Sequence, residues 1–296
     1  MSHRRPCVVA LGTVSLDTIE SAGSVAHEVL GGSAPYFGAA ARFSCDVALV
    51  GVVGDDFPAE LLRPLEAHGV DVSAIERKAG ETFRWHARYQ ADGSRETLGT
   101  SRERALRAEP TVPDALRDPA VLFLGSTNPH TQASVLSSCG APKLVVLDTM
   151  AHWVRDHRAA FLAVAHQADV VLMAHDEAAE LGRGDAQRGA QALLEAGCAW
   201  VVVKQGERGA TAFALERAIS VTSPRPASVV DPTGAGDAFA GGLVEALAQK
   251  LDMEQALSRA ATLGSLAVES FSLDRLLTLT PEQVEAHQSN AVSQSS

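Results

Sequence analysis

Short runs of apolar, mostly β-branched residues recur along the chain and alternate with segments of helical periodicity. Runs of this length and valine content are typical of strands that are buried on both faces. Strands and helices in alternation predict βαβ units, and therefore a mostly parallel sheet with helices on both sides. The predicted strands are 7–11, 47–53, 121–124, 144–147, 170–173 and 200–203, and the clearest helices are 34–43, 58–68, 131–137, 158–167, 185–196 and 236–250.

One region, residues 77–107, interrupts this alternation. From Thr82 to Gln90 apolar and polar residues partly alternate before a Gly-containing turn, which predicts a β-hairpin. The region holds eight Lys or Arg against four Asp or Glu. A basic hairpin inserted in an α/β fold is a candidate lid over a site. On composition alone the favoured alternative is a solvated edge hairpin, whose charges discourage aggregation.

Composition narrows the class of protein. The 296 residues are 46% hydrophobic and 21% charged, so we expect one large core and a single domain over 1–296. A net charge of -11 argues against nucleic-acid and membrane-surface partners. The first apolar stretch is broken at Gly12 and Asp17, too early for a signal peptide. Four widely spaced cysteines predict free thiols, mostly buried, in a reducing cytoplasm.

The strongest local signal is a turn of small residues at 231–237, Asp-Pro-Thr-Gly-Ala-Gly-Asp, which precedes an amphipathic segment. Gly234, Ala235 and Gly236 leave backbone N–H groups uncovered at the start of a helix, where the dipole amounts to about half a positive charge. This is a candidate anion site made without Lys or Arg. Asp237 beside it is explained by activation of an attacking hydroxyl. The alternative is a first-turn acid that complements the helix dipole.

Residues 231–239 resemble the C-terminal signature of the ribokinase-like carbohydrate kinases, also called the phosphofructokinase B (PfkB) type. Segments leading to Asp17, at 31–42, at 50–56 and at 202–210 resemble further family motifs in the same order, so the resemblance spans about residues 8–279. It implies a three-layer α/β/α fold with a mostly parallel central sheet and a small β-strand lid. The lid would comprise about 13–33 and 80–100, which reverses the interpretation of the basic hairpin.

The activity that the resemblance implies is ATP-dependent phosphorylation of a hydroxyl on a sugar, nucleoside or cyclitol. Asp237 would be the base that takes the hydroxyl proton, and Gly234, Ala235 and Gly236 would form the anion hole. Asp17 would bind substrate hydroxyls, which suits a carboxylate that accepts two hydrogen bonds from a vicinal diol. Without the resemblance, Asp17 is better explained as a turn residue after the first strand.

The resemblance assigns further residues to the two substrates. The Gly-Gly signature, which comprises Gly31, Gly32 and Ser33, would let the backbone approach the acceptor at a lid hinge. On the nucleotide side, 261–272 would flank the adenine. The residues implied for ATP binding are Lys204, Gly206, Gly209, Thr233 and Gly264.

Metal and cation sites are implied only indirectly. Mg²⁺ is expected with ATP, and in some members the position of Asp231 helps to hold a monovalent cation such as K⁺. The family usually carries Asn-x-x-Glu near the end of the fifth strand, for placement of Mg²⁺ and phosphate. Here Glu177 remains, but Ala174 stands in the Asn position. His175 and Asp176 are candidate substitutes, and both are also explained as the start of a helix.

The acceptor pocket departs from that of a plain ribokinase. Where the family often has an Asn that touches the sugar, Tyr36 or Phe37 would make the pocket more apolar and aromatic. This favours a nucleoside, a cyclitol such as inositol, or a modified sugar. Arg84 and Arg88 alternate on one face of the lid strand and would reach a substrate carboxylate or phosphate. A solvated face is an equal alternative.

Three functions therefore stay open: an active kinase, an inactive relative that binds a ligand, and a kinase that uses ADP or acts on a sugar phosphate. Only Ala174 supports the second, and the arginines of the lid permit a sugar phosphate. Asp148 and Asn128 follow predicted strands, where α/β sheets place ligand contacts, although strand-end capping explains both as well. A homodimer through the lid edge is also expected, and a monomer in light scattering would contradict it.

Overall fold

The computed structural model of the chain describes residues 7–21, 23–90, 93–101 and 109–294. Nine strands form one large sheet in the order β13-β12-β11-β10-β9-β8-β1-β4-β5. From β5 to β11 the neighbours are parallel, whereas β12 and β13 continue the sheet as an antiparallel hairpin. The strands are β1 (Cys7–Leu11), β4 (Asp46–Val53), β5 (Asp71–Arg77), β8 (Val121–Leu124), β9 (Leu144–Asp148), β10 (Val170–Ala174), β11 (Trp200–Lys204), β12 (Ala210–Phe213) and β13 (Ala218–Val221).

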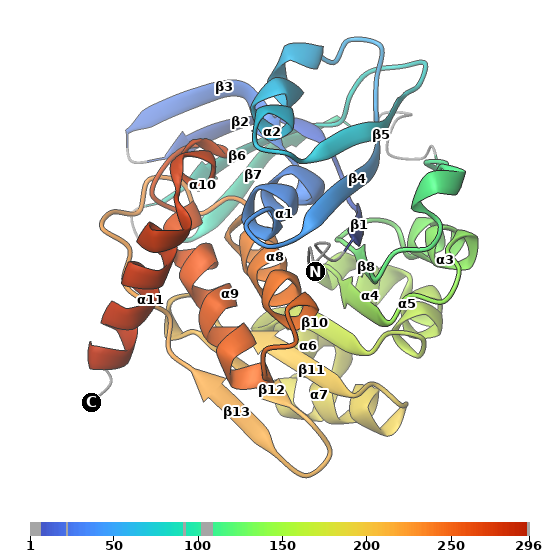
Figure 1. Cartoon of the computed structure of the whole chain (residues 1–296), viewed down its shortest axis with the longest axis vertical. Coiled ribbons are helices and arrows are strands. Elements are labelled where there is room, and N and C mark those ends of the chain that lie inside the picture. The colour runs from blue at the N-terminus through green and yellow to red at the C-terminus, as the bar shows by residue number, and fades with distance from the viewer. Residues whose placement is uncertain (1–6, 22, 91–92, 102–108, 295–296) are drawn as a thin grey trace, which may run out of the picture.

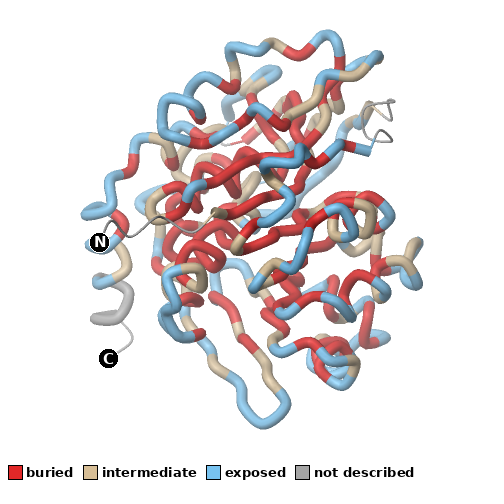
Figure 2. The backbone as a smooth tube through the Cα atoms, turned by 45° about the vertical axis from the view of Figure 1, so that its right-hand side comes forward, coloured by how far each residue is buried: buried red, intermediate tan, exposed pale blue. Residues whose placement is uncertain are grey.

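The large sheet separates two hydrophobic cores. Successive residues of a strand point to opposite faces, and β1 shows the result. Val8 and Ala10 pack into one core, and Val9 and Leu11 pack into the other. Buried positions accordingly concentrate in these strands and in the helices against them (Figure 2). The predicted parallel sheet with helices on both sides is confirmed.

Helices from different parts of the chain cover the two faces. One face is covered by helices from the N-terminal part and the C-terminal third, and the other by helices from the middle of the chain (Figure 1). The first group is α1 (Ser33–Ala41), α2 (Arg63–Ala67), α8 (Ala235–Ala248), α9 (Met253–Ala267), α10 (Asp274–Thr278) and α11 (Pro281–Gln294). The second group is α3 (Pro129–Ser138), α4 (Ala151–Asp156), α5 (Arg158–Ala165), α6 (His175–Leu181) and α7 (Ala186–Glu195).

A second, small sheet of four strands lies at one end of the molecule, in the order β3-β2-β6-β7 (Figure 1). It comprises the two segments from which the sequence predicts a lid. The hairpin predicted within 77–107 is formed by β6 and β7, and the residues at 91–92 and 102–108 lie outside the described ones. This hairpin is not isolated, because β6 also pairs in parallel with β2. The strands are β2 (Ser15–Ser21), β3 (Ser24–Gly31), β6 (Arg84–Tyr89) and β7 (Arg95–Thr100).

Asp56 attaches the small sheet to the core. Its Oδ1 accepts hydrogen bonds from the backbone N–H of Thr82 at 2.7 Å and from the Thr82 hydroxyl at 2.8 Å, and its Oδ2 lies 2.6 Å from Nη1 of Arg84. Desolvation opposes the ionised form, but these partners outweigh it and lower the pKa of Asp56 to about 2. The motif at 50–56 therefore anchors the start of β6.

The remaining sequence predictions concern thiols and membranes. None of the four cysteines forms a disulfide within the described residues, and three of them are buried while Cys7 is half-buried. Among the residues described here, no helix combines the length and the apolar character that crossing a bilayer requires.

Candidate active site

Charged groups gather where the parallel strands end and the small sheet begins. They come from β2, from the carboxyl ends of β9 and β11, and from the starts of α6 and α8. The charge of each group shifts the pKa of at least one other group, so they form one cluster. The crevice beyond the carboxyl ends of the strands is the usual place for a ligand in an open α/β sheet. The cluster comprises Asp17, Asp148, Glu177, Asp231, Asp237 and Lys204.

The turn before α8 depends on Gly234. This residue has φ 75°, in the left-handed region, and precedes the first residue of the helix. A Cβ here would lie 2.3 Å from the ring of Tyr36, which is itself only 2% exposed. The side chain of Asp231 accepts from the N–H of Thr233 at 2.9 Å and stabilises the preceding bend.

The amides at the start of α8 differ slightly from the predicted set. The N–H of Ala235 donates to the carbonyl of Pro232 at 3.3 Å, so the turn itself uses this amide. The N–H groups of Gly236 and Asp237 belong to the first helical turn, where no intrahelical acceptor is available. Together with the helix dipole they make this end of α8 a candidate anion-binding end that is built from backbone alone.

Asp237 lies next to this anion-binding end. Desolvation, reinforced by the negative charge of Asp148 and opposed by Lys204, raises the pKa of Asp237 to about 7. A carboxyl group with such a pKa exchanges a proton near neutral pH, which a general base requires.

Lys204 and Asp148 form an ion pair across the ends of β11 and β9. Nζ of Lys204 lies 2.8 Å from Oδ2 and 3.0 Å from Oδ1 of Asp148, whose side chain is 2% exposed. Burial by itself would lower the pKa of Lys204. The negative charges of Asp148 and Glu177 outweigh burial and raise this pKa above its ordinary value, so the ammonium group stays charged. A Cβ on Gly236 would lie 3.4 Å from the same Nζ, so the cation lies beside the head of α8.

Asp17 lies in the buried part of the cluster and is 3% exposed. Burial is the main cause that raises its pKa to about 7, with Ser15 opposing and Asp231 adding to the shift. Its Oδ1 has no hydrogen-bond partner among the described residues. A Cβ on Gly31 would lie 2.0 Å from Oδ2, which explains the glycine. The site therefore offers a buried carboxylate oxygen to a donor from outside the chain.

Other residues of the Gly-Gly signature hold the backbone in place. Gly32 has φ 94°, and a Cβ on it would lie 2.3 Å from the carbonyl oxygen of Thr13. The hydroxyl of Ser33 accepts from the N–H of Thr13 at 3.0 Å, and the N–H of Ser33 donates to the hydroxyl of Thr13 at 3.1 Å. Phe37 points into the core, where it stacks on Phe123 with ring centroids 4.0 Å apart. Of the two aromatic candidates, Tyr36 is the one whose ring packs against Gly234 in the turn at 231–237.

Two arginines of β6, Arg84 and Arg88, point away from the predicted acceptor site. In-register partners in a parallel pair share a face, and Arg84 and Arg88 pair with Leu16 and Glu20, whereas Trp85 pairs with Asp17. Arg84 donates to Glu28 at 2.8 Å, and Arg88 donates to Glu20 at 2.7 Å. The prediction that they alternate on one face is correct. That face is opposite to Asp17, because strand alternation cannot say which face is inside until the register is known.

The sequence predictions omitted two residues that the structure brings to the site. Tyr89, at the end of β6, accepts a hydrogen bond from the hydroxyl of Thr233 at 3.2 Å and so connects the small sheet to the turn at 231–237. Trp85, earlier on the same strand, lies beside Asp17. The two residues are an even number of positions apart in one strand, so the sequence predicts that they share a face. The basic residues Arg84 and Arg88 lie on the other face of this strand.

The glycines predicted on the nucleotide side have different surroundings. Gly209 has φ 94°, and its Cβ would lie 2.0 Å from the carbonyl oxygen of Val221, so the approach of β13 requires glycine. Gly206 also has positive φ, but the space around it is open. Gly264 lies where α9 crosses α8, and its Cβ would lie 3.1 Å from the carbonyl oxygen of Ala235. Helix packing therefore accounts for Gly264, and its contact with ATP stays a prediction.

The Mg²⁺ prediction depends on groups that have structural tasks here. Glu177 accepts from the N–H of Ala174 at 2.6 Å and begins α6, while burial raises its pKa. His175 and Asp176 are exposed, and Asn128 caps α3 by accepting from the N–H of His130 at 2.9 Å. Within the described ranges, no three or more His, Cys, Asp or Glu side chains gather to hold a metal.

Solved structures with a similar fold are kinases. A nucleoside kinase from Burkholderia thailandensis, solved in complex with inosine, aligns with a TM-score of 0.82 and 17% identity over 97% of this chain and 99% of that chain. The ribokinase of Arabidopsis thaliana, complexed with ribose and ATP, aligns with a TM-score of 0.76 and 21% identity over 96% and 99%. These likenesses confirm the ribokinase-like fold class.

A family model described as pfkB family carbohydrate kinase matches residues 12–278, and the chain belongs to this family. A cytidine kinase from Thermococcus kodakarensis is 26% identical over 257 residues, which cover 84% of this chain and 91% of that protein. The protein is therefore an ATP-dependent kinase with an alcohol group as acceptor, of the class that phosphorylates sugars or nucleosides.

Proposed function

We propose that the enzyme transfers the γ-phosphate of ATP to a hydroxyl of a sugar, nucleoside or cyclitol, with Asp237 as the general base. The observation that carries the proposal is the position of Asp237 at the anion-binding end of α8, with a pKa raised to about 7. Phosphoryl transfer requires mainly positioning and charge stabilisation, and this arrangement supplies both.

The proposed steps use groups of this chain. Asp17 accepts hydrogen bonds from acceptor hydroxyls and orients the reacting one towards Asp237. Asp237 takes the proton as the oxygen attacks, and the amides at the start of α8 stabilise charge on the transferring group. Lys204, released from Asp148, adds a positive charge on the nucleotide side. Mg²⁺ bound with ATP would neutralise phosphate charge next to Asp148 and Glu177.

A monovalent cation is a further part of the proposal. Asp231 is 1% exposed, and its Oδ2 lacks a hydrogen-bond partner among the described residues. Burial raises its pKa, which a cation at this oxygen would reverse.

We also propose a single domain in which the small sheet closes as a lid. A homodimer would pair through the edge strands of this sheet, which carry the exposed Val25 and Leu98.

Coupled detection of ADP over a panel of sugars, sugar phosphates, nucleosides and inositols tests the function. We expect at least one neutral acceptor to give ADP well above the rate with ATP alone. If one compound raises the melting temperature but none gives ADP, the inactive-relative alternative replaces the proposal. A strict preference for a phosphorylated acceptor would favour the sugar-phosphate alternative. Replacing ATP with ADP as the donor, and detecting AMP as the product over the same panel, tests the alternative of an ADP-dependent kinase.

The pH dependence of turnover follows from the pKa of Asp237. A general base acts when it is deprotonated, so kcat/KM should fall about tenfold per pH unit below about pH 7 and level off above it. Because the folded pKa is raised, the Asp237 carboxyl lowers stability as pH rises from about 4 to 7. Activity and stability should therefore change in opposite directions across this window.

Asp148→Asn should move the acid limb of the same profile to lower pH, because it removes a negative neighbour that raises the pKa of Asp237. Asp114→Asn is the matched control, since its side chain is 91% exposed and distant in the fold. An acid limb that moves upward in Asp148→Asn would contradict the assignment of the limb to Asp237.

A further inference from the structure

The face of the small sheet that lies next to Asp17 is apolar and aromatic. The β2–β6 register pairs Asp17 with Trp85 and Ile19 with Ala87, and neighbouring strands lie about 4.8 Å apart. Ile19 and Ala87 are at most 1% exposed, whereas Trp85 is half-buried. Trp85 therefore offers the only accessible surface of these three side chains beside the acceptor-binding carboxylate.

Most of the positive charge of the small sheet is directed elsewhere. Arg84 and Arg88 point to the opposite face, where Glu28, Asp56, Glu20 and Glu96 neutralise them. Arg95 does share the face of Trp85, with its guanidinium 5.4 Å from the Trp85 ring. It interacts there with the hydroxyl of Tyr89, at the end of β6 that meets Thr233. This cation therefore lies between Trp85 and the phosphoryl-transfer end of the sheet.

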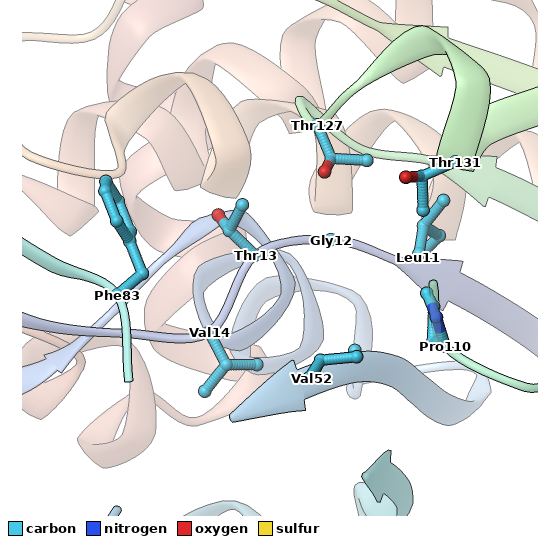
Figure 3. A pocket seen from close by; sticks show the side chains of 10 residues that line it. Leu11, Gly12, Thr13, Val14, Val52, Phe83, Pro110, Thr127 and Thr131 are labelled. Carbon is cyan, nitrogen blue, oxygen red and sulfur yellow. The ribbon is translucent and has the colours of Figure 1, made fainter. Parts of the chain in front are cut away.

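A pocket at the other end of the small sheet is lined by uncharged residues. It lies beyond the carboxyl ends of β1 and β4, with Phe83 on one side and Thr127 and Thr131 on the other (Figure 3). The space in it is about 30 Å³, which suffices for about one water. The lining residues are Leu11, Gly12, Thr13, Val14, Gly51, Val52, Phe83, Pro110, Thr127 and Thr131.

The charges deep in the site discriminate against an anionic acceptor. Asp17 is nearly inaccessible, and its Oδ1 has no partner in the described part of the chain. Such an oxygen is satisfied by a hydroxyl donor, and an ionised carboxylate repels a second negative charge. The acceptor should therefore combine sugar hydroxyls at Asp17 with an uncharged, flat group at Trp85.

We infer that the acceptor is a nucleoside, whose sugar hydroxyls bind Asp17 and whose base lies against Trp85, next to the uncharged pocket beside Phe83. The inference rests on the proposed function and narrows its acceptor class. Aromatic side chains hold bases by stacking, and hydroxyls such as those of Thr127 and Thr131 accept from or donate to base edges.

The test compares kcat/KM for cytidine, inosine, ribose, fructose, myo-inositol and ribose 1-phosphate, in the wild-type chain and in Trp85→Ala. We expect a nucleoside to be the best acceptor. Loss of the stacking surface should raise its KM about tenfold or more with kcat little changed, while the constants for free ribose stay within about twofold. Trp85→Phe should retain most of the nucleoside preference and shows that the strand still folds.

Trp200→Ala is the matched control, because Trp200 also has an arginine over its ring, Arg217 at 4.8 Å, but lies at the amino end of β11. Higher kcat/KM for ribose 1-phosphate, fructose, ribose or inositol would overturn the inference while the kinase proposal stands. If no acceptor gives ADP, the kinase proposal fails, and calorimetric titration with the two nucleosides decides the inference. Nucleoside binding that becomes weaker in Trp85→Ala would support the inference. Absence of nucleoside binding would overturn it.

Discussion

Asp237→Asn is expected to lower kcat by about two to four orders of magnitude, the usual contribution of a positioned general base. The substitution keeps the size and the first-turn position of the side chain but removes the proton acceptor. ATP affinity should be unchanged or higher, since a negative charge next to the phosphate site is lost. Steady-state kinetics and calorimetric titration with ATP measure the two effects separately.

The matched control is Glu254→Gln, an exposed acid in the first turn of α9. If Asp237 only complemented the dipole of α8, the two variants would behave alike, with small losses of stability and nearly normal turnover. Near-normal kcat in Asp237→Asn would therefore remove the base assignment and return Asp237 to a structural role.

Gly234→Ala should produce the second large effect, on stability and on turnover. Left-handed φ costs a non-glycine residue about 1–2 kcal/mol, and displacing the buried Tyr36 ring adds about 1–3 kcal/mol of overpacking. Misplacing the amides at the start of α8 should also lower kcat by about 100-fold or more, as loss of an oxyanion-type donor does. Thermal unfolding and steady-state kinetics measure these changes.

Gly69→Ala provides the control, because Gly69 has φ 82° but a Cβ on it would meet no atom within 4 Å. It should show only the conformational cost, with kcat unchanged. If both variants lose equal stability and keep normal kcat, the contact between Gly234 and Tyr36 does not organise the turn.

Hydrophobic patterning was most reliable for the elements of the large sheet. Strands such as β1 and β8 are buried on both faces, so their apolar runs are nearly continuous and their ends are sharp. The patterning missed β2 and β3, because polar residues interrupt both faces of β2 and most residues of β3 are exposed or half-buried. It also missed β12 and β13, which are only four residues each and partly exposed.

The candidate site also has features that the sequence predicts and contacts that only the fold creates. Motif residues that act through the local backbone, such as Gly234 and Gly32, were identifiable because positive φ requires glycine wherever the chain folds that way. The ion-pair partner of Lys204 was not identifiable from the sequence, because Asp148 lies 56 positions away and the two residues meet only across β10. The contact between Tyr89 and Thr233 spans 144 positions and depends on how the small sheet docks.

The sequence by itself determined the class of fold and the kinase family, and it singled out the turn at 231–237 as the candidate catalytic turn, because these depend on local periodicity and on motifs in order. Only the tertiary structure decided which face of β6 meets Asp17. Strand side chains alternate with a period of two, so a pattern gives two sets of residues without saying which set is inside. The register with β2 makes that choice, and it selects Trp85 over Arg84 and Arg88.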